Sequence, residues 1–158
     1  MRLTLGAALA AVLLAACSSS SHDSFGLRNA AVDALWVCPP GSTNAPYDVN
    51  AKFDVHNPGS SSVSIQSVAA VMTLVAVSGT WLEKVGDTYD ASARSFVPLR
   101  AVAHADTTVI VAIPSGCTSG KAGSAPGSHG DYRVTLTVTT SAGVYTITPS
   151  RSHRIAAG

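Results

Sequence analysis

Apolar and polar side chains alternate along several short stretches of this 158-residue chain, with the period of two that is typical of a β-strand buried on one face. Residues 48–57 and 132–139 show the pattern best. Their apolar positions are Val49, Ala51, Phe53 and Val55 in the first stretch, and Tyr132, Val134, Leu136 and Val138 in the second. The second stretch leads through Thr-Ser-Ala-Gly into residues 144–148, which predicts a β-hairpin.

Less regular patterns predict further strands. Residues 36–38 are extended in character, and the apolar residues of 27–35 before them have helical spacing, which favours a short helical turn or an irregular lead-in. An alternation that resumes at Val63 shifts register near residues 66–67, which indicates a β-bulge or a strand break. The valine-rich run 68–77 that follows predicts a strand buried on both faces.

The pattern continues with a polar connection, residues 79–95, that has room for one edge strand. Residues 96–99 are broken by Pro98 and fit an edge strand, whereas residues 107–113 form a strong strand that Pro114 is expected to end. The total is about seven strands, with no helix able to cover a sheet. This pattern predicts an all-β fold, an antiparallel sandwich.

Glycine, serine and proline are so dense in residues 115–130 that regular structure is not expected there. We expect a long, mobile loop that Cys117 holds near its start, and this loop is the candidate binding site. Its candidate contact residues are Ser115, Lys121, Ser128 and His129. An alternative contact surface consists of the aromatic residues Tyr47, Trp81 and Tyr89.

The first residues have a different pattern from the rest of the chain. A single charge, Arg2, precedes an uncharged apolar run, residues 3–16, which is shorter than the ~20 residues of a membrane-spanning helix and predicts a secretory signal. The run ends in Leu-Ala-Ala and leads directly into Cys17, and four serines follow. This arrangement resembles the lipobox of bacterial lipoproteins.

The resemblance implies that residues 1–16 are removed, that Cys17 receives a diacylglyceryl group, and that residues 17–33 tether a domain at 34–158 to a membrane. Because Ser18 rather than aspartate follows the cysteine, it also implies transfer to the outer membrane if the cell has one, and otherwise the outer face of the cytoplasmic membrane. Each buried methylene contributes ~0.8 kcal/mol, so two or three acyl chains hold a protein firmly. The alternative is a plain secretory signal that leaves the cysteine as a free thiol.

Composition limits the class of protein. Removing the 16 leader residues from 158 leaves 142, enough for one domain with its own core. The chain has 10 Lys plus Arg and 9 Asp plus Glu, and loss of Arg2 reduces the first count to nine. Balanced charge provides no basic field for nucleic acid and no acidic field for calcium.

The cysteines indicate an oxidising compartment. With Cys17 assigned to lipid, Cys38 and Cys117 remain as a pair, which predicts a disulfide between them. Two free thiols or a metal site are the alternatives. Neither a Cys-x-x-Cys motif nor a nearby histidine cluster supports the metal site.

Two motifs carry a second resemblance. The stretch Phe-Asp-Val-His-Asn-Pro-Gly-Ser-Ser-Ser-Val-Ser-Ile from Phe53, and Gly-Asp-Tyr-Arg-Val around Tyr132, resemble bacterial immunoglobulin-like domains, with the tyrosine at their tyrosine corner. The resemblance implies an immunoglobulin-like sandwich. Two features depart from it, because Trp36 precedes Cys38, and because Cys117 is expected in a loop. The disulfide is therefore not expected to be the antibody inter-sheet bridge.

Candidate chemistry is sparse. The adjacent Ser128 and His129 lack the surroundings of a hydrolase nucleophile, and no residue is assigned a catalytic role. His56 and Met72 could bind copper if they met across neighbouring strands. We therefore expect a lipid-anchored, extracytoplasmic binding or structural module without a cofactor or bound metal, whose partner is an envelope protein or a glycan. A copper-binding protein is the alternative, and a hydrolase is a distant third.

Overall fold

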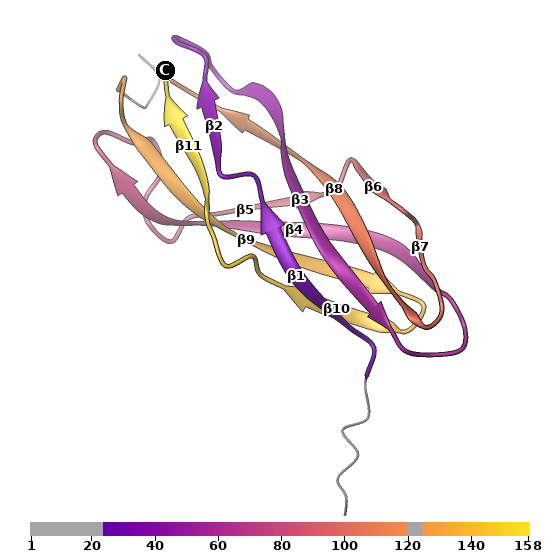
Figure 1. The fold of residues 1–158 in the computed structure, drawn as a ribbon. Helices are drawn as coiled ribbons and strands as arrows, with labels where there is room; N and C mark the ends of the chain where they lie inside the picture. Colours follow the sequence, from indigo (N-terminus) through magenta and orange to yellow (C-terminus); the bar gives the residue numbers. More distant parts are fainter. Residues whose placement is uncertain (1–23, 120–124) are drawn as a thin grey trace, which may run out of the picture.

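The computed structural model describes residues 24–119 and 125–158, which form two β-sheets packed face to face (Figure 1). The first sheet has the strand order β1-β3-β8-β6, and its pairs are antiparallel. Its strands are β1 (Gly26–Val32), β3 (Ala45–Asn57), β8 (Ala105–Cys117) and β6 (Ser95–Val97). Strands β3 and β8 pair continuously over thirteen residues, which is about 40 Å of extended chain.

The second sheet follows the order β2-β11-β9-β4-β5, with β10 paired to β9 and β7 paired to β4. Its strands are β2 (Leu35–Cys38), β11 (His153–Ala157), β9 (His129–Thr140), β4 (Val63–Ser78), β5 (Thr88–Ser92), β10 (Gly143–Ile147) and β7 (Arg100–Ala101). Strands β2 and β11 run parallel, whereas the other pairs in the sheet are antiparallel.

The core lies between the sheets and consists mainly of the inward-pointing alternate residues of the four longest strands, with Cys38, Ala101 and Ile155 from shorter strands. Its largest fully buried apolar side chains are Phe53, Met72, Leu74, Ile113 and Leu136, with valines around them. The alternation predicted for residues 48–57 and 132–139 is confirmed, since their apolar positions are the buried ones. Burying a side chain such as Leu136 stabilises the fold by about 1.5–3 kcal/mol relative to leaving it in water.

The structure confirms the all-β, immunoglobulin-like sandwich and several of its details. The hairpin pairs Gly143 with Thr140, the register of β4 shifts between Ile65 and Ser67, and β6 is an edge strand beside β8. The strand count was wrong, because the described residues contain eleven strands. The sandwich is antiparallel as predicted, apart from the short parallel pair of β2 and β11.

Residues 27–35 form neither the short helical turn nor the irregular lead-in expected there, because β1 occupies Gly26–Val32. Pairing of β1 with β3 is interrupted between Arg28 and Ala31, and Asn29 within this bulge has a positive φ of 55°. An extra residue in a bulge changes the side-chain spacing from two to three, which imitates helical periodicity. The ordered sheet therefore begins inside the segment 17–33 that was interpreted as a tether.

Two further strand predictions need correction. The run 68–77 is buried on one face only, since Val68, Ala70 and Met72 are buried while Ala69 and Val71 are exposed. Small apolar side chains on the solvent face of β4 concealed the alternation.

Strand β8 does not end before Pro114 but continues to Cys117. Strand β6 pairs only with residues 110–112 of β8, so proline at 114 removes no donor from a sheet ladder.

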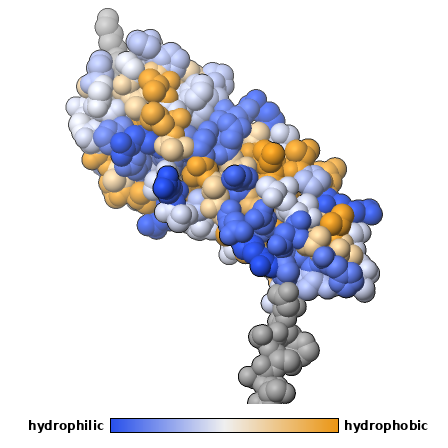
Figure 2. Space-filling model, viewed as in Figure 1, coloured by the Kyte–Doolittle hydropathy of each residue, from blue (hydrophilic) through white to orange (hydrophobic). Residues whose placement is uncertain are grey.

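The two ends of the sandwich differ in what they carry. The chain enters β1 at one end, where Gly26 pairs with His56, and β2 and β11 both finish at the other end (Figure 1). On the face in Figure 2, hydrophobic side chains gather over β6 and over β2, while hydrophilic ones lie along β1 and β3. Within the described residues, no helix is long and apolar enough to cross a membrane.

Candidate functional site

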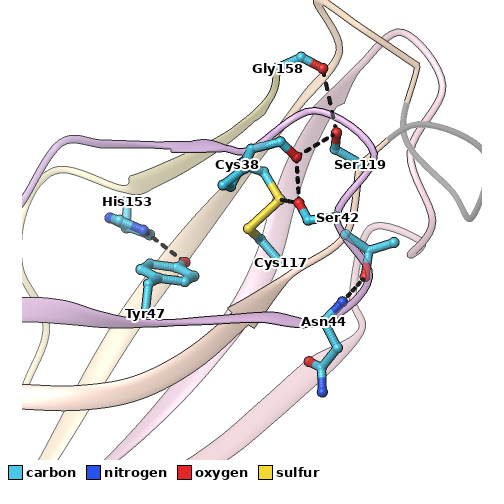
Figure 3. The surroundings of a disulfide bond; sticks show 10 residues. Cys38, Ser42, Asn44, Tyr47, Cys117, Ser119, His153 and Gly158 are labelled. Carbon is cyan, nitrogen blue, oxygen red and sulfur yellow. Dashed lines mark hydrogen bonds between the residues drawn. A yellow bond between two sulfur atoms is a disulfide. The ribbon is translucent and has the colours of Figure 1, made fainter.

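A disulfide joins the two sheets at the end of the sandwich where β2 and β8 finish. Cys38 and Cys117 are linked, with their Cα atoms 5.8 Å apart, which confirms the predicted pair (Figure 3). Cys117 lies in β8 rather than in a loop, so the bond connects the sheets near their ends. The Ser119 hydroxyl lies within hydrogen-bond distance of the Pro39 and Gly158 carbonyls, at 3.2 and 3.4 Å, and ties three segments together there.

A cleft of about 470 Å³ opens between the sheets beside this disulfide. Met72 and Ile155, both in the second sheet, line it together with β8 residues and the segment before β5. A smaller hollow of about 160 Å³ shares Glu83, Gly116 and Tyr132 with it, so the two adjoin, and we describe them together as the cleft. A cleft of this size is within the range of ligand sites in proteins.

The edge of β8 forms one wall of the cleft. Arg94 donates its backbone N–H to the Ala112 carbonyl (2.8 Å), and the Tyr89 hydroxyl donates to the Pro114 carbonyl (3.1 Å). Backbone groups of alternate residues point to the same side of a strand, so the N–H and C=O of Gly116 point to this edge as well. Strand β6 pairs with residues 110–112 and does not reach Gly116. No strand in the described ranges pairs with residues 113–117 of β8 on this side.

The connection between β4 and β5, residues 79–87, forms the opposite wall, and β9 holds it in place. The Ser128 hydroxyl accepts the backbone N–H of Thr80 (3.0 Å), and the Trp81 indole N–H donates to the Tyr132 hydroxyl (3.0 Å). Trp81 lies against Gly130, where a Cβ atom would come within 2.7 Å of the indole nitrogen. A glycine in β9 therefore provides the space for this aromatic side chain.

Glu83 is the one carboxylate among the described residues that line the cleft. Its carboxylate accepts a hydrogen bond from the Tyr132 hydroxyl. Burial raises the pKa of Tyr132 above its ordinary value, and the neighbouring carboxylate raises it further, so the phenol stays protonated and keeps donating. The nearby Arg94 guanidinium is bound to Asp48 at 3.2 Å. No lysine, arginine or histidine in the described part of the chain forms an ion pair with Glu83.

A second polar cluster lies inside the sandwich near the disulfide. His153 is fully buried, and its Nε2 atom lies 3.1 Å from the Tyr47 hydroxyl (Figure 3). Its Nδ1 atom lies 2.8 Å from the Asp33 carbonyl and 3.1 Å from the carboxylate of the same residue. Because both neighbours of Nδ1 are acceptors, we assign the imidazole proton to Nδ1 and infer that Nε2 accepts the tyrosine proton. Tyr47 also stacks on Trp36.

Three aspartates have a pKa below the ordinary value, for different reasons. Burial acts to raise the pKa of Asp33, but hydrogen bonds from His153 and Asn50 together outweigh it. Asp54 accepts hydrogen bonds from the Thr108 hydroxyl and the Asn29 amide, and these bonds lower the pKa of its carboxylate. Asp131 accepts two hydrogen bonds from the Arg154 guanidinium, which lower the pKa of Asp131 in the same way.

These shifts predict that the protein loses stability in acid. A carboxylate whose pKa is lower in the folded than in the unfolded chain stabilises the fold above the unfolded pKa, and this contribution is lost as the pH falls through the folded pKa. We expect a nearly constant melting temperature between about pH 7 and pH 5 and a progressive fall below about pH 4. Asp54→Asn should reduce the size of the fall, and a melting temperature that stays constant down to about pH 2 would contradict the prediction.

The residues predicted to lie together in a mobile binding loop belong to different parts of the fold. Ser115 lines the cleft but belongs to β8, and Ser128 is buried and anchors Thr80. His129 is the first residue of β9, where it pairs with Ala156. The long mobile loop expected at 115–130 is therefore wrong at both ends. Two predicted residues, Lys121 and Cys17, lie outside the described residues.

The copper-binding pair that the sequence offered as an alternative is not formed. His56 in β3 and Met72 in β4 belong to different sheets, and His56 is bound to Asp106 at 2.7 Å. Within the described ranges, no group of three or more histidine, cysteine, aspartate or glutamate side chains is placed to hold a metal ion. The tyrosine corner is also wrong, because the Tyr132 hydroxyl donates to Glu83 rather than to the backbone upstream.

Two of the three alternative aromatic contacts border the cleft. Tyr89 lines its larger part and Trp81 its smaller part, whereas Tyr47 is buried. The sequence interpretation missed Glu83. Its only local signal is a carboxylate between aromatic residues in a polar connection, and such a pattern does not reveal which strand edge it will face.

The two sheets and the cleft define an immunoglobulin-like β-sandwich with a polar hollow at its disulfide-linked end. No protein-family model and no curated protein sequence matches the chain. Among solved structures it is similar to AggA, the major subunit of aggregative adherence fimbriae type I from Escherichia coli, with 7% identity and a TM-score of 0.38, covering 86% of this chain and 97% of that one. It is also similar to PapD-like domain 7 of human CEP192, with 13% identity and a TM-score of 0.25, covering 81% of this chain and 82% of that domain. Both TM-scores are low, so neither likeness bears on function.

Proposed function

We propose that this protein is a lipid-anchored, non-catalytic binding module on the extracytoplasmic side of a membrane, the outer membrane where the cell has one. The observation that carries the proposal is the placement of the cleft relative to the entry of the chain. Gly26 pairs with His56 at one end of β3, and Ala45 pairs with Cys117 at the other end, about 40 Å away. A chain anchored through Cys17 would therefore present its cleft away from the membrane.

The compartment rests on two independent features of the chain. The Leu-Ala-Ala-Cys leader supports export and lipidation at Cys17. The bond between Cys38 and Cys117 supports an oxidising environment, since disulfides persist outside the reducing cytoplasm.

The composition of the cleft supports binding rather than catalysis. Its ionisable lining residues are Glu83, Arg94 and two tyrosines, and no histidine or free cysteine lines it in the described part of the chain. Tyr132 is held protonated, and Arg94 is bound to Asp48, so neither is positioned to exchange protons or attack a substrate. An apolar base with a few convergent polar groups is typical of a ligand-binding site.

Replacement of the lipidation residue tests the anchoring. Mass spectrometry of the membrane-extracted protein should show an acylated chain that begins at Cys17, and Cys17→Ala should shift the domain to the soluble fraction or stall its processing. The matched control, Ser18→Ala, should stay in the membrane fraction. A mature chain with an unmodified N-terminal cysteine that is freely soluble would overturn the anchoring.

A further inference from the structure

We propose that the cleft binds an extended peptide, which adds as a strand to the open edge of β8 and places a basic side chain on Glu83. The inference rests on the proposed binding function and names the chemistry of the partner. It depends on three features that the described residues give the cleft: a β8 edge without a strand partner, an apolar base, and a carboxylate, that of Glu83, without a cationic partner.

The strand edge supplies the main-chain recognition. Beyond the Ala112 and Pro114 carbonyls, which Arg94 and Tyr89 occupy, the outward N–H and C=O of Gly116 face the cleft. An unpaired edge favours the addition of another strand, because a donor and an acceptor on one residue match those of an extended backbone. A sugar or a compact metabolite has no extended backbone that would pair with both the N–H and the C=O of one edge residue.

The two sheets determine where the peptide side chains go. Side chains of a strand alternate, so every second residue of the peptide would point inward between the sheets. At the base of the cleft such side chains meet Met72 and Ile155, and on the facing wall they meet Glu83. The cleft therefore selects an apolar residue and a residue of opposite charge two positions apart.

The charge at this wall specifies a basic residue. Glu83 is exposed, accepts one hydrogen bond from Tyr132 and has no cationic partner among the described residues. Tyr89 and Trp81 flank the cleft, and aromatic rings attract ammonium and guanidinium groups. Hydrogen bonds between charged groups are about twice as strong as neutral ones, so a lysine or arginine gains most from this site.

The test uses the full-length mature protein in detergent and three capped heptapeptides in isothermal titration calorimetry. The first has the sequence Thr-Val-Thr-Lys-Thr-Val-Thr, with lysine and valines on one face. In the second, glutamate replaces the lysine. In the third, proline replaces the two threonines beside the lysine and so removes backbone donors. We expect the first to bind, and the other two to bind at least about tenfold more weakly.

Two variants locate the binding site. Glu83→Gln should weaken binding of the lysine peptide by about tenfold, because it removes the charge while keeping the shape. Asp90→Asn is the matched control: it removes the same charge from β5, outside the cleft, and should leave the affinity unchanged. Equal binding of the lysine and glutamate peptides, or the same affinity in Glu83→Gln, would overturn the inference.

A glycan probe separates this inference from the proposed function. If chitotriose binds in a manner that depends on Glu83 while no peptide binds, the peptide inference is wrong and the binding module stands. If no probe binds, the peptide inference is also overturned, whereas the anchoring is decided independently by the mass of the N-terminal cysteine.

Discussion

Replacing both Cys38 and Cys117 with alanine is expected to lower the free energy of unfolding by about 4 kcal/mol. The disulfide closes a loop with a sequence separation of 79 residues, and loss of such a cross-link enlarges the unfolded ensemble. It also releases the ends of β2 and β8, and the second of these carries one wall of the cleft. Urea unfolding of the purified domain, followed by tryptophan fluorescence, measures the change.

The comparison needs a common background. Both proteins should carry Cys17→Ala, which removes the third cysteine without altering any residue of the described domain. Equal slopes of the unfolding transitions would show that the two proteins expose the same surface on unfolding. A loss below about 1 kcal/mol would show that the disulfide contributes little, and that other contacts hold the two sheets together at this end.

His153→Ala is expected to be similarly destabilising, by about 4 kcal/mol. The substitution opens a cavity at a fully buried position, and it leaves the Tyr47 hydroxyl and the Asp33 carboxylate without their imidazole partner. A buried polar group that loses its partner costs about 1–3 kcal/mol in addition to the loss of packing. Thermal unfolding and urea unfolding should give the same ranking of the variants.

Two variants provide the controls for the buried histidine. His129→Ala changes a partly buried histidine of β9 and should cost less than about 1 kcal/mol. Tyr47→Phe keeps the ring stacked on Trp36 and removes only the hydroxyl, so it should cost about 1 kcal/mol. If His153→Ala is as mild as His129→Ala, the polar cluster is not a structural element of the core.

The parts of the fold that could be predicted depend on short-range patterns. Alternation at 48–57 and 132–139 reflects burial on one face, and the pairing of Cys38 with Cys117 was predicted from the cysteine count. By contrast, β11 escaped detection because its five residues include His153, a polar residue that long-range contacts bury. The bulge in β1 was mistaken for helical periodicity, because its extra residue separates apolar side chains by three positions instead of two.

The cleft could not be predicted from the sequence because neither wall is a local feature. Ser115 was expected in a mobile loop, but continuous pairing with β3 carries β8 past Pro114 and makes the same residues a rigid strand edge. Glu83 faces that edge only because Trp81 and Tyr132 attach the β4–β5 connection to β9. These contacts join residues about fifty positions apart, and no local pattern specifies them.

Amide hydrogen exchange measured by NMR tests the binding cleft most directly, with and without the lysine heptapeptide. The peptide is expected to slow exchange of the Gly116 amide, which faces the open edge of β8, and to shift the resonances of Glu83 and Tyr89. The amide of Val71, on β4 in the second sheet and away from the cleft, should exchange at an unchanged rate. Binding of the peptide with no change at Gly116, and with protection at β2 or β6 instead, would contradict the account.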